Sequence, residues 1–157
     1  MQIKVLNIGA TELPYLREGI DQYLKRLKHY VPVEMINTPR IRAGKTASPE
    51  HTKEQEGNLI IRHLTGSETA VLLDEHGKQM TSQAFSQYLL RYMNQGVKTL
   101  TFITGGAFGF SNAVHDRVKE SIALSSMTFP HQLVRLIFLE QLYRAFTILK
   151  GESYHHI

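Results

Sequence analysis

The glycine-rich segment GGAFGF, residues 105–110, is the part of the sequence whose composition points most directly to ligand binding. Glycines allow backbone amides to approach a ligand closely, and a following helix adds partial positive charge at its first turn. The segment matches neither the G-x-x-x-x-G-K-[ST] phosphate-binding loop nor the G-x-G-x-x-G pattern of dinucleotide-binding folds. It therefore predicts either a ligand-binding loop of another kind or a tight turn that only needs glycine.

A second unusual segment, residues 123–146, joins small hydroxyl residues to a strongly apolar stretch. Ser125 and Ser126 precede Pro130, and proline is favoured at the first position of a helix. His131 near a pair of serines could indicate hydrolase chemistry. The sequence lacks the G-x-S-x-G motif of that class, however, so hydrolase chemistry is not expected.

The elements that must position these segments follow from the spacing of apolar residues. Expected strands cover residues 2–8, 33–37, 70–74, 98–104 and 122–125. Expected helices cover residues 13–29, 50–64, 81–94, 111–119 and about 130–150. Strands that alternate with helices predict an α/β fold with a mostly parallel sheet. No repeat, low-complexity tract or linker interrupts the chain, so we expect a single domain over residues 1–157.

Three of the expected strand ends stand out as candidate ligand-binding segments. In open α/β sheets, ligands bind beyond the carboxyl ends of the strands. The three ends are Leu73-Asp74, the glycine-rich residues 105–109, and the segment Leu124–Phe129. We expect these segments to converge on one site.

Composition limits the possible classes of protein. The 157 residues are 42% hydrophobic and 20% charged, which is typical of a chain that folds around a core. The absence of cysteine excludes disulfides and cysteine-based zinc sites, and His115 and Asp116 are expected at the surface, so no metal is expected. With no signal peptide and no run of about 20 apolar residues, we expect a cytoplasmic protein without a membrane span.

The net charge of +4 permits a polyanionic partner without requiring one. Basic residues gather at the end of the first expected helix and in the loop after residues 33–37. These residues are Lys25, Arg26, Lys28 and His29 in the helix, and Arg40, Arg42 and Lys45 in the loop. Both clusters are compatible with a solvated surface or with a surface that contacts phosphates.

The last expected helix, residues 130–150, carries apolar side chains on two sides. One side holds Leu136, Leu139, Tyr143 and Phe146 among polar residues, and the other holds Val134, Phe138, Leu142, Ala145 and Leu149. A helix that is apolar nearly all round is usually buried nearly all round. Each large apolar side chain left in water would forgo about 1.5–3 kcal/mol. We therefore expect a homodimer through this helix, with Leu139 exposed in an isolated protomer.

Four stretches together resemble the H-type large-subunit rRNA pseudouridine methyltransferases of the SPOUT class. They are SSMTFPHQLVRLIFLEQLYRAF (125–146), FITGGAFGF (102–110), IKVLNIG (3–9) and YHH (154–156), and the resemblance extends over essentially the whole chain. It implies an α/β fold whose C-terminal part forms a deep trefoil knot, and a homodimer that binds S-adenosylmethionine in the knot. True knots are rare, so periodicity alone does not lead to this fold.

By matching motif positions, the resemblance implies that the three strand ends hold the cofactor. The implied contacts are Leu73, Gly105, Leu124, Ser125, Ser126, Met127, Thr128 and Phe129. Small and hydroxyl residues suit a loop that passes tightly through a knot and offers backbone hydrogen bonds. Leu124, Met127 and Phe129 are expected to enclose the adenine.

The implied activity is methyl transfer from S-adenosylmethionine to N3 of a pseudouridine in 23S rRNA of the assembled ribosome, without a metal. The sulfonium is already activated, so alignment of donor and acceptor is the main requirement. The acceptor is a mostly protonated imide, so a base or an anion-stabilising group should help. The candidates are Glu140, Arg144, Tyr154 and His155.

Each of these candidates has a plainer interpretation. Glu140 and Arg144 are also spaced as an ordinary helical salt bridge, and Tyr154 and His155 could belong to a frayed terminus. His156 stands where the family motif has a basic residue, which weakens the case for a phosphate contact in the tail.

Two other functions remain open at this point. A catalytically silent RNA- or ribosome-binding protein could have the same fold, although the cofactor-loop residues are intact. A nucleotide-binding oxidoreductase is suggested by GGAFG alone and lacks the dinucleotide fingerprint.

Overall fold

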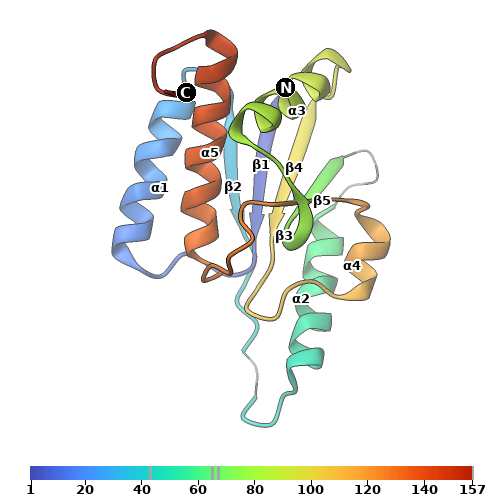
Figure 1. Ribbon diagram of the computed structural model, residues 1–157. Helices are drawn as coiled ribbons and strands as arrows, with labels where there is room; N and C mark the ends of the chain where they lie inside the picture. Colours follow the sequence, from blue (N-terminus) through green and yellow to red (C-terminus); the bar gives the residue numbers. More distant parts are fainter. Residues whose placement is uncertain (43, 65, 67, 157) are drawn as a thin grey trace.

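The computed structural model describes residues 1–157 except residues 43, 65, 67 and 157 (Figure 1). In this described part, five strands form one sheet in the order β2-β1-β4-β3-β5, and all neighbours pair in parallel. The strands are β1 (Gln2–Asn7), β2 (Val33–Asn37), β3 (Thr69–Gln79), β4 (Thr99–Thr104) and β5 (Glu120–Ala123). The predicted α/β fold with a parallel sheet is confirmed.

Helices cover both faces of the sheet. They are α1 (Pro14–Leu27), α2 (Pro49–His63), α3 (Ser82–Asn94), α4 (Asn112–Arg117) and α5 (Leu133–Lys150). Successive strand residues point to opposite faces, so the core is divided into two clusters. Val71 and Phe102 pack with α1, α3 and α5, whereas Leu72 and Ile103 pack with α2 and α4.

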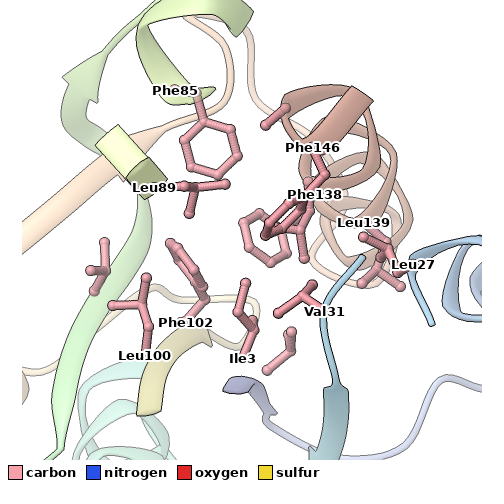
Figure 2. Packing of buried hydrophobic residues seen from close by; sticks show 14 of the residues in the cluster. Ile3, Leu27, Val31, Phe85, Leu89, Leu100, Phe102, Phe138, Leu139 and Phe146 are labelled. Atoms are coloured by element: carbon pink, nitrogen blue, oxygen red, sulfur yellow. The ribbon is translucent and has the colours of Figure 1, made fainter. Parts of the chain in front are cut away.

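Three aromatic rings fix α3 and α5 against the centre of the sheet (Figure 2). The ring centroids of Phe102 and Phe138 lie 4.6 Å apart, and Phe85 lies 6.2 Å from both. Tilted and edge-on ring pairs of this kind add to the burial of apolar area. The start of α5 is thereby held at the carboxyl end of the central strands.

Local side-chain caps explain where three helices begin. Ser48 accepts a hydrogen bond from the backbone of His51 at the start of α2, and Thr81 accepts one from Ala84 at the start of α3. Ser111 likewise accepts one from the backbone of Val114 at the start of α4. Such caps satisfy amides that have no partner within the helix.

Several expected boundaries were wrong. The last strand covers Glu120–Ala123 and not residues 122–125, because Leu124 and Ser125 already belong to the segment that lines the cavity. α5 begins at Leu133 and not near Pro130, because Pro130 and the next residues form a turn in which the Pro130 carbonyl accepts from the amide of Leu133 at 2.9 Å. β3 continues beyond the expected end at Asp74 to Gln79, because its backbone pairs with β5 again at Lys78 and Gln79. Ile122 is aligned with both Leu73 and Lys78, so residues 74–77 bulge out of the ladder.

The expectation that Leu139 is exposed in a protomer was also wrong, because it is 0% exposed within its own chain. α5 contacts both α1 and α3 and lies over the sheet, so most of both apolar sides is buried intramolecularly (Figure 1). Leu136 packs closely against Gly19 of α1. A partly exposed outer strip remains, with Leu133, Ile137 and Ile148 outside the apolar core clusters.

No helix among the described residues is long and apolar enough to cross a membrane.

Candidate functional site

The three strand ends converge on one cavity of about 680 Å³. Its walls are the β3 bulge (residues 73–76), the glycine-rich turn (residues 104–110) and the segment after β5 (residues 124–125 and 127–131), with Lys53, His115 and Val134 at the margins. A volume of this size is typical of small-molecule and cofactor sites. The topology of the parallel sheet therefore places the segments singled out in the sequence around one space.

Seven of the eight expected cofactor residues line this cavity: Leu73, Gly105, Leu124, Ser125, Met127, Thr128 and Phe129. Ser126 is the exception, since it is not among the lining residues. Two hydrogen bonds hold this loop in place. The amide of Met127 donates to the Ser125 hydroxyl at 2.9 Å, and the Thr128 hydroxyl donates to Glu75 across the cavity at 2.9 Å.

Carboxylate and imidazole groups give the cavity a polar side that sequence reasoning did not assign. Asp74 accepts a hydrogen bond from the backbone of His76 at 3.0 Å, and its other oxygen lies 3.6 Å from Nε2 of His115. The sequence marks Asp74 only as the end of a strand and predicts His115 at the surface. The β3 bulge and the position of α4 bring them together.

His131 lies on the cavity wall, although sequence reasoning gave it no role. Burial lowers the pKa of His131, and the positive charges of Arg135 and Arg40 lower it further. Arg135 is completely buried and donates to the Ile8 carbonyl at 2.6 Å and to Thr11 at 2.9 Å. His131 is therefore a neutral imidazole at neutral pH, able to accept a proton.

A second polar cluster contains all four expected catalytic residues. Glu140 accepts hydrogen bonds from the Tyr154 hydroxyl at 3.1 Å and from Nε of Arg144 at 3.1 Å. A guanidinium nitrogen of Arg144 lies 3.4 Å from Nδ1 of His155. Burial and the neighbouring Tyr23 and Glu140 raise the pKa of Tyr154, which keeps the phenol protonated. The C-terminal tail is thus docked on α5.

The tail cluster lies further along α5 than the cavity does, beginning at Glu140 near the middle of the helix. Val134 lines the cavity, whereas Arg144 lies ten residues later, which corresponds to about 15 Å along the helix axis. Figure 1 shows the tail that follows Lys150 folding back beside the last turns of α5, at the end opposite the segment that enters the helix from β5. Within one chain, the expected catalytic and cofactor residues therefore form two separate groups.

Two large apolar side chains at the cavity are exposed. Phe108, in the glycine-rich turn, is 50% exposed, and Met127, in the segment after β5, is 73% exposed. Exposed apolar groups at a concave site are typical of a contact surface for a ligand or partner. No group of three or more potential metal ligands occurs among the described residues.

Comparisons with known proteins agree with this arrangement. The family model described as "Predicted SPOUT methyltransferase" matches residues 1–155. The ribosomal RNA large subunit methyltransferase H of Parabacteroides distasonis is 49% identical over 156 residues, covering 99% of both chains. The protein of the same name from Cytophaga hutchinsonii is also 49% identical, covering 99% of this chain and all of its own.

Among solved structures, the tRNA (m1G37) methyltransferase of Aquifex aeolicus superposes with a TM-score of 0.57. The superposition covers 100% of this chain and 76% of the Aquifex chain. Because the two sequences are only 13% identical, this similarity supports the fold alone. The family match over residues 1–155 and the relatives at 49% identity show the family itself. The chain belongs to the SPOUT methyltransferases, in the family of the ribosomal RNA large subunit methyltransferases H.

Proposed function

We propose that this protein transfers the methyl group of S-adenosylmethionine to N3 of a pseudouridine in 23S rRNA of the assembled ribosome. The observation that supports this most strongly is the cavity built from three strand ends in a chain of this family. The substrate is the one named for its relatives, large-subunit ribosomal RNA. Such a reaction takes place in the bacterial cytoplasm, where ribosomes are assembled.

The cavity residues fit S-adenosylmethionine by size and chemistry. Leu73, Leu124 and Phe129 offer apolar walls for the adenine, and the turn at Gly105 offers backbone groups. Asp74 and Glu75 place carboxylates beside a cofactor that carries a sulfonium cation. The cofactor supplies an activated methyl group, and the protein contributes binding, orientation and exclusion of water.

The acceptor imide must lose its proton at N3, and two groups of this chain are suited to help. His131 is a neutral imidazole on the cavity wall and can accept a proton. The Arg144 guanidinium, held by Glu140, can stabilise a developing anion. Phe108 and Met127 offer an apolar contact surface at the cavity for the incoming base.

We infer that the active form is a homodimer in which the tail of one copy faces the cavity of the other. Within one chain, none of the four residues of the tail cluster lines the cavity, and Arg144 lies ten residues after Val134 on α5. In an antiparallel pair of α5 helices, the end of one helix lies beside the start of its partner. The partly exposed strip with Leu133, Ile137 and Ile148 supplies a contact surface for such a pair.

The C-terminal trefoil knot remains a prediction of the family resemblance. The proximity of the glycine-rich turn and the segment after β5, which line the same cavity, supports it.

Mass spectrometry of 23S rRNA from a deletion strain is the direct test of the activity. We expect one pseudouridine to lose one methyl group, and purified wild-type protein with S-adenosylmethionine to restore it on ribosomes from that strain. Calorimetry that detects no binding of S-adenosylmethionine would favour the alternative of a catalytically silent RNA-binding protein.

Mixing two inactive variants tests the shared site. Gly105→Val is expected to damage only the cavity, and Glu140→Gln only the tail cluster. If the tail acts on the partner's cavity, each mixed dimer has one intact site, so random mixing should restore about a quarter of wild-type activity. If both groups act within one chain, the mixture stays inactive.

A further inference from the structure

Glu56 of α2 is an acidic side chain that has no part in the proposed methyl transfer. It is only 9% exposed, and its Oε2 atom has no hydrogen-bond partner among the described residues. Burial raises the pKa of Glu56. An unpaired carboxylate is costly to bury, so this environment favours the protonated form.

The carboxyl group of Glu56 lies directly against the backbone of Gly106. A Cβ atom added to Gly106 would be 2.6 Å from Oε1 and 2.7 Å from Cδ of Glu56, closer than non-bonded atoms can approach. Gly106 belongs to the glycine-rich turn that lines the cavity. A side chain at position 106 would therefore have to displace either the end of the Glu56 side chain or the turn, and glycine allows the two residues to pack in this close contact.

The next residue of α2 makes a second close approach to the same segment. A Cβ atom on Gly57 would lie 3.1 Å from Cβ of Ser111 and 3.2 Å from Cγ2 of Val114. Ser111 caps α4, which follows the glycine-rich turn. α2 thus contacts residues 106–114 through two successive residues, Glu56 and Gly57. Of the two, only Glu56 has a polar side chain, and that side chain lies against the turn.

We propose that Glu56 is a positioning residue for the cofactor site, because its buried carboxyl group holds Gly106 and the glycine-rich turn at the cavity wall. This role rests on the proposed function, since it assumes that the cavity binds S-adenosylmethionine. Glu56 itself does not line the cavity, so it acts through the turn. Its effect should appear in cofactor affinity and leave the Michaelis constant for the rRNA substrate unchanged.

Four variants separate this role from simple packing. Glu56→Gln keeps the shape without the charge, and we expect its dissociation constant for S-adenosylmethionine to stay within about twofold of wild type. Gly106→Ala should weaken binding at least about tenfold, because the added methyl displaces the turn. Glu56→Ala should weaken it by a smaller factor. Glu56→Ala/Gly106→Ala should bind more tightly than Gly106→Ala alone, since the shortened side chain makes room for the methyl.

The matched control is Glu54→Ala, which removes an exposed glutamate from the same helix and should bind the cofactor like wild type. Calorimetry provides the affinities, and circular dichroism checks that each variant is folded. The proposal is overturned if folded Glu56→Ala binds like wild type, if Glu56→Gln is as weak as Glu56→Ala, or if the effects in the double variant are simply additive.

A separate readout distinguishes this proposal from the proposed function. Amide resonances recorded without cofactor provide this readout. Those of Gly105 and Gly109 should shift in Glu56→Ala and in Gly106→Ala, and those of Gly105, Gly106 and Gly109 should stay in place in Glu56→Gln. Wild-type protein that does not bind S-adenosylmethionine would contradict the proposed function, and the role of Glu56 at the cofactor site would then fall with it. Unmoved resonances in Glu56→Ala would overturn the role of Glu56 alone.

Discussion

At the scale of single residues, the cavity joins a backbone turn, two carboxylates and a neutral imidazole within one small space. Asp74 is tied to two histidines, Glu75 is tied to Thr128, and His131 has a pKa lowered by burial and by nearby arginines. None of these groups is held by a regular helix or strand interaction alone. Each depends on a neighbour that is distant in the sequence.

Gly105→Val should abolish cofactor binding in a folded protein. A Cβ atom on Gly105 would already lie 3.3 Å from Cζ of the buried Phe110, and the two further methyl groups of valine have to move the turn. Calorimetry with S-adenosylmethionine measures the effect. Gly44→Val is the control, because nothing lies within 4 Å of a Cβ atom there. Unchanged affinity in Gly105→Val would remove the turn from the cofactor site.

His131 should make the stability of the protein depend on pH. Its folded-state pKa is lowered from the ordinary value of about 6.5, so the unfolded chain binds more protons as the solution is acidified. The contribution to stability is present above about pH 6.5 and is lost as the pH falls through the folded-state pKa. Urea unfolding at about pH 7.5 and about pH 5.5 should show a smaller loss for His131→Gln than for wild type. Equal losses would contradict the pKa shift.

At the scale of elements, α5 connects the cavity to the docked tail. Its inner residues are buried against α1, α3 and the sheet, while the outer strip stays partly exposed. Mean hydropathy does not separate these two roles, because both the buried side and the outer strip carry large aliphatic side chains such as Leu139 and Leu133. The packing of α5 therefore decides which substitutions affect folding and which affect association.

Leu139→Glu should prevent folding, whereas Ile137→Glu should leave a folded monomer. Leu139 is fully buried, so the substitution places an unpaired charge in the core. Ile137 lies on the outer strip, where a glutamate stays solvated in the monomer but is buried in the proposed dimer. Circular dichroism and light scattering at micromolar concentration measure the two effects. A dimeric Ile137→Glu protein would move the interface to another face.

At the scale of the whole molecule, the docked tail brings Glu152 and Tyr154 back to α5 and to the tyrosines of and after α1. Tyr154 contacts Tyr23 and Glu140 through its hydroxyl, and Tyr30 donates to Glu152 at 2.5 Å. The ring of Tyr154 also packs on Tyr143, with centroids 4.8 Å apart. These contacts argue against a frayed terminus and place the tail well away from the cavity of its own chain.

Truncation after Gly151 should leave cofactor affinity within a few-fold of wild type and lower methyl transfer about 10²-fold or more. The removed residues do not line the cavity, but they include half of the tail cluster. Calorimetry and single-turnover methylation of ribosomes measure both effects on the same protein. Ser153→Ala, which changes an exposed residue of the tail and keeps Glu152, Tyr154 and His155, is the control. Wild-type turnover after truncation would show that the tail has no part in the chemistry, and lost cofactor binding would assign it to the cofactor site.

The sequence by itself predicted the α/β class, the parallel sheet, and the three strand ends that line the cavity. It could do so because strand and helix periodicities are local, and because parallel strands necessarily bring their carboxyl ends to one edge. The glycine-rich turn and the segment after β5 were recognisable for the same reason. The family resemblance also named Glu140 and Tyr154, which the structure brings within 3.1 Å of each other.

Only the tertiary structure decided the rest, because it depends on contacts between distant residues. The β3 bulge presents Asp74 and Glu75 to the cavity through pairing with β5. The burial of Leu139 follows from α1 and α3 packing on both sides of α5, and the contact of Glu56 with Gly106 follows from the placement of α2. Periodicity identifies an apolar face, but which element covers that face is fixed only when the chain has packed.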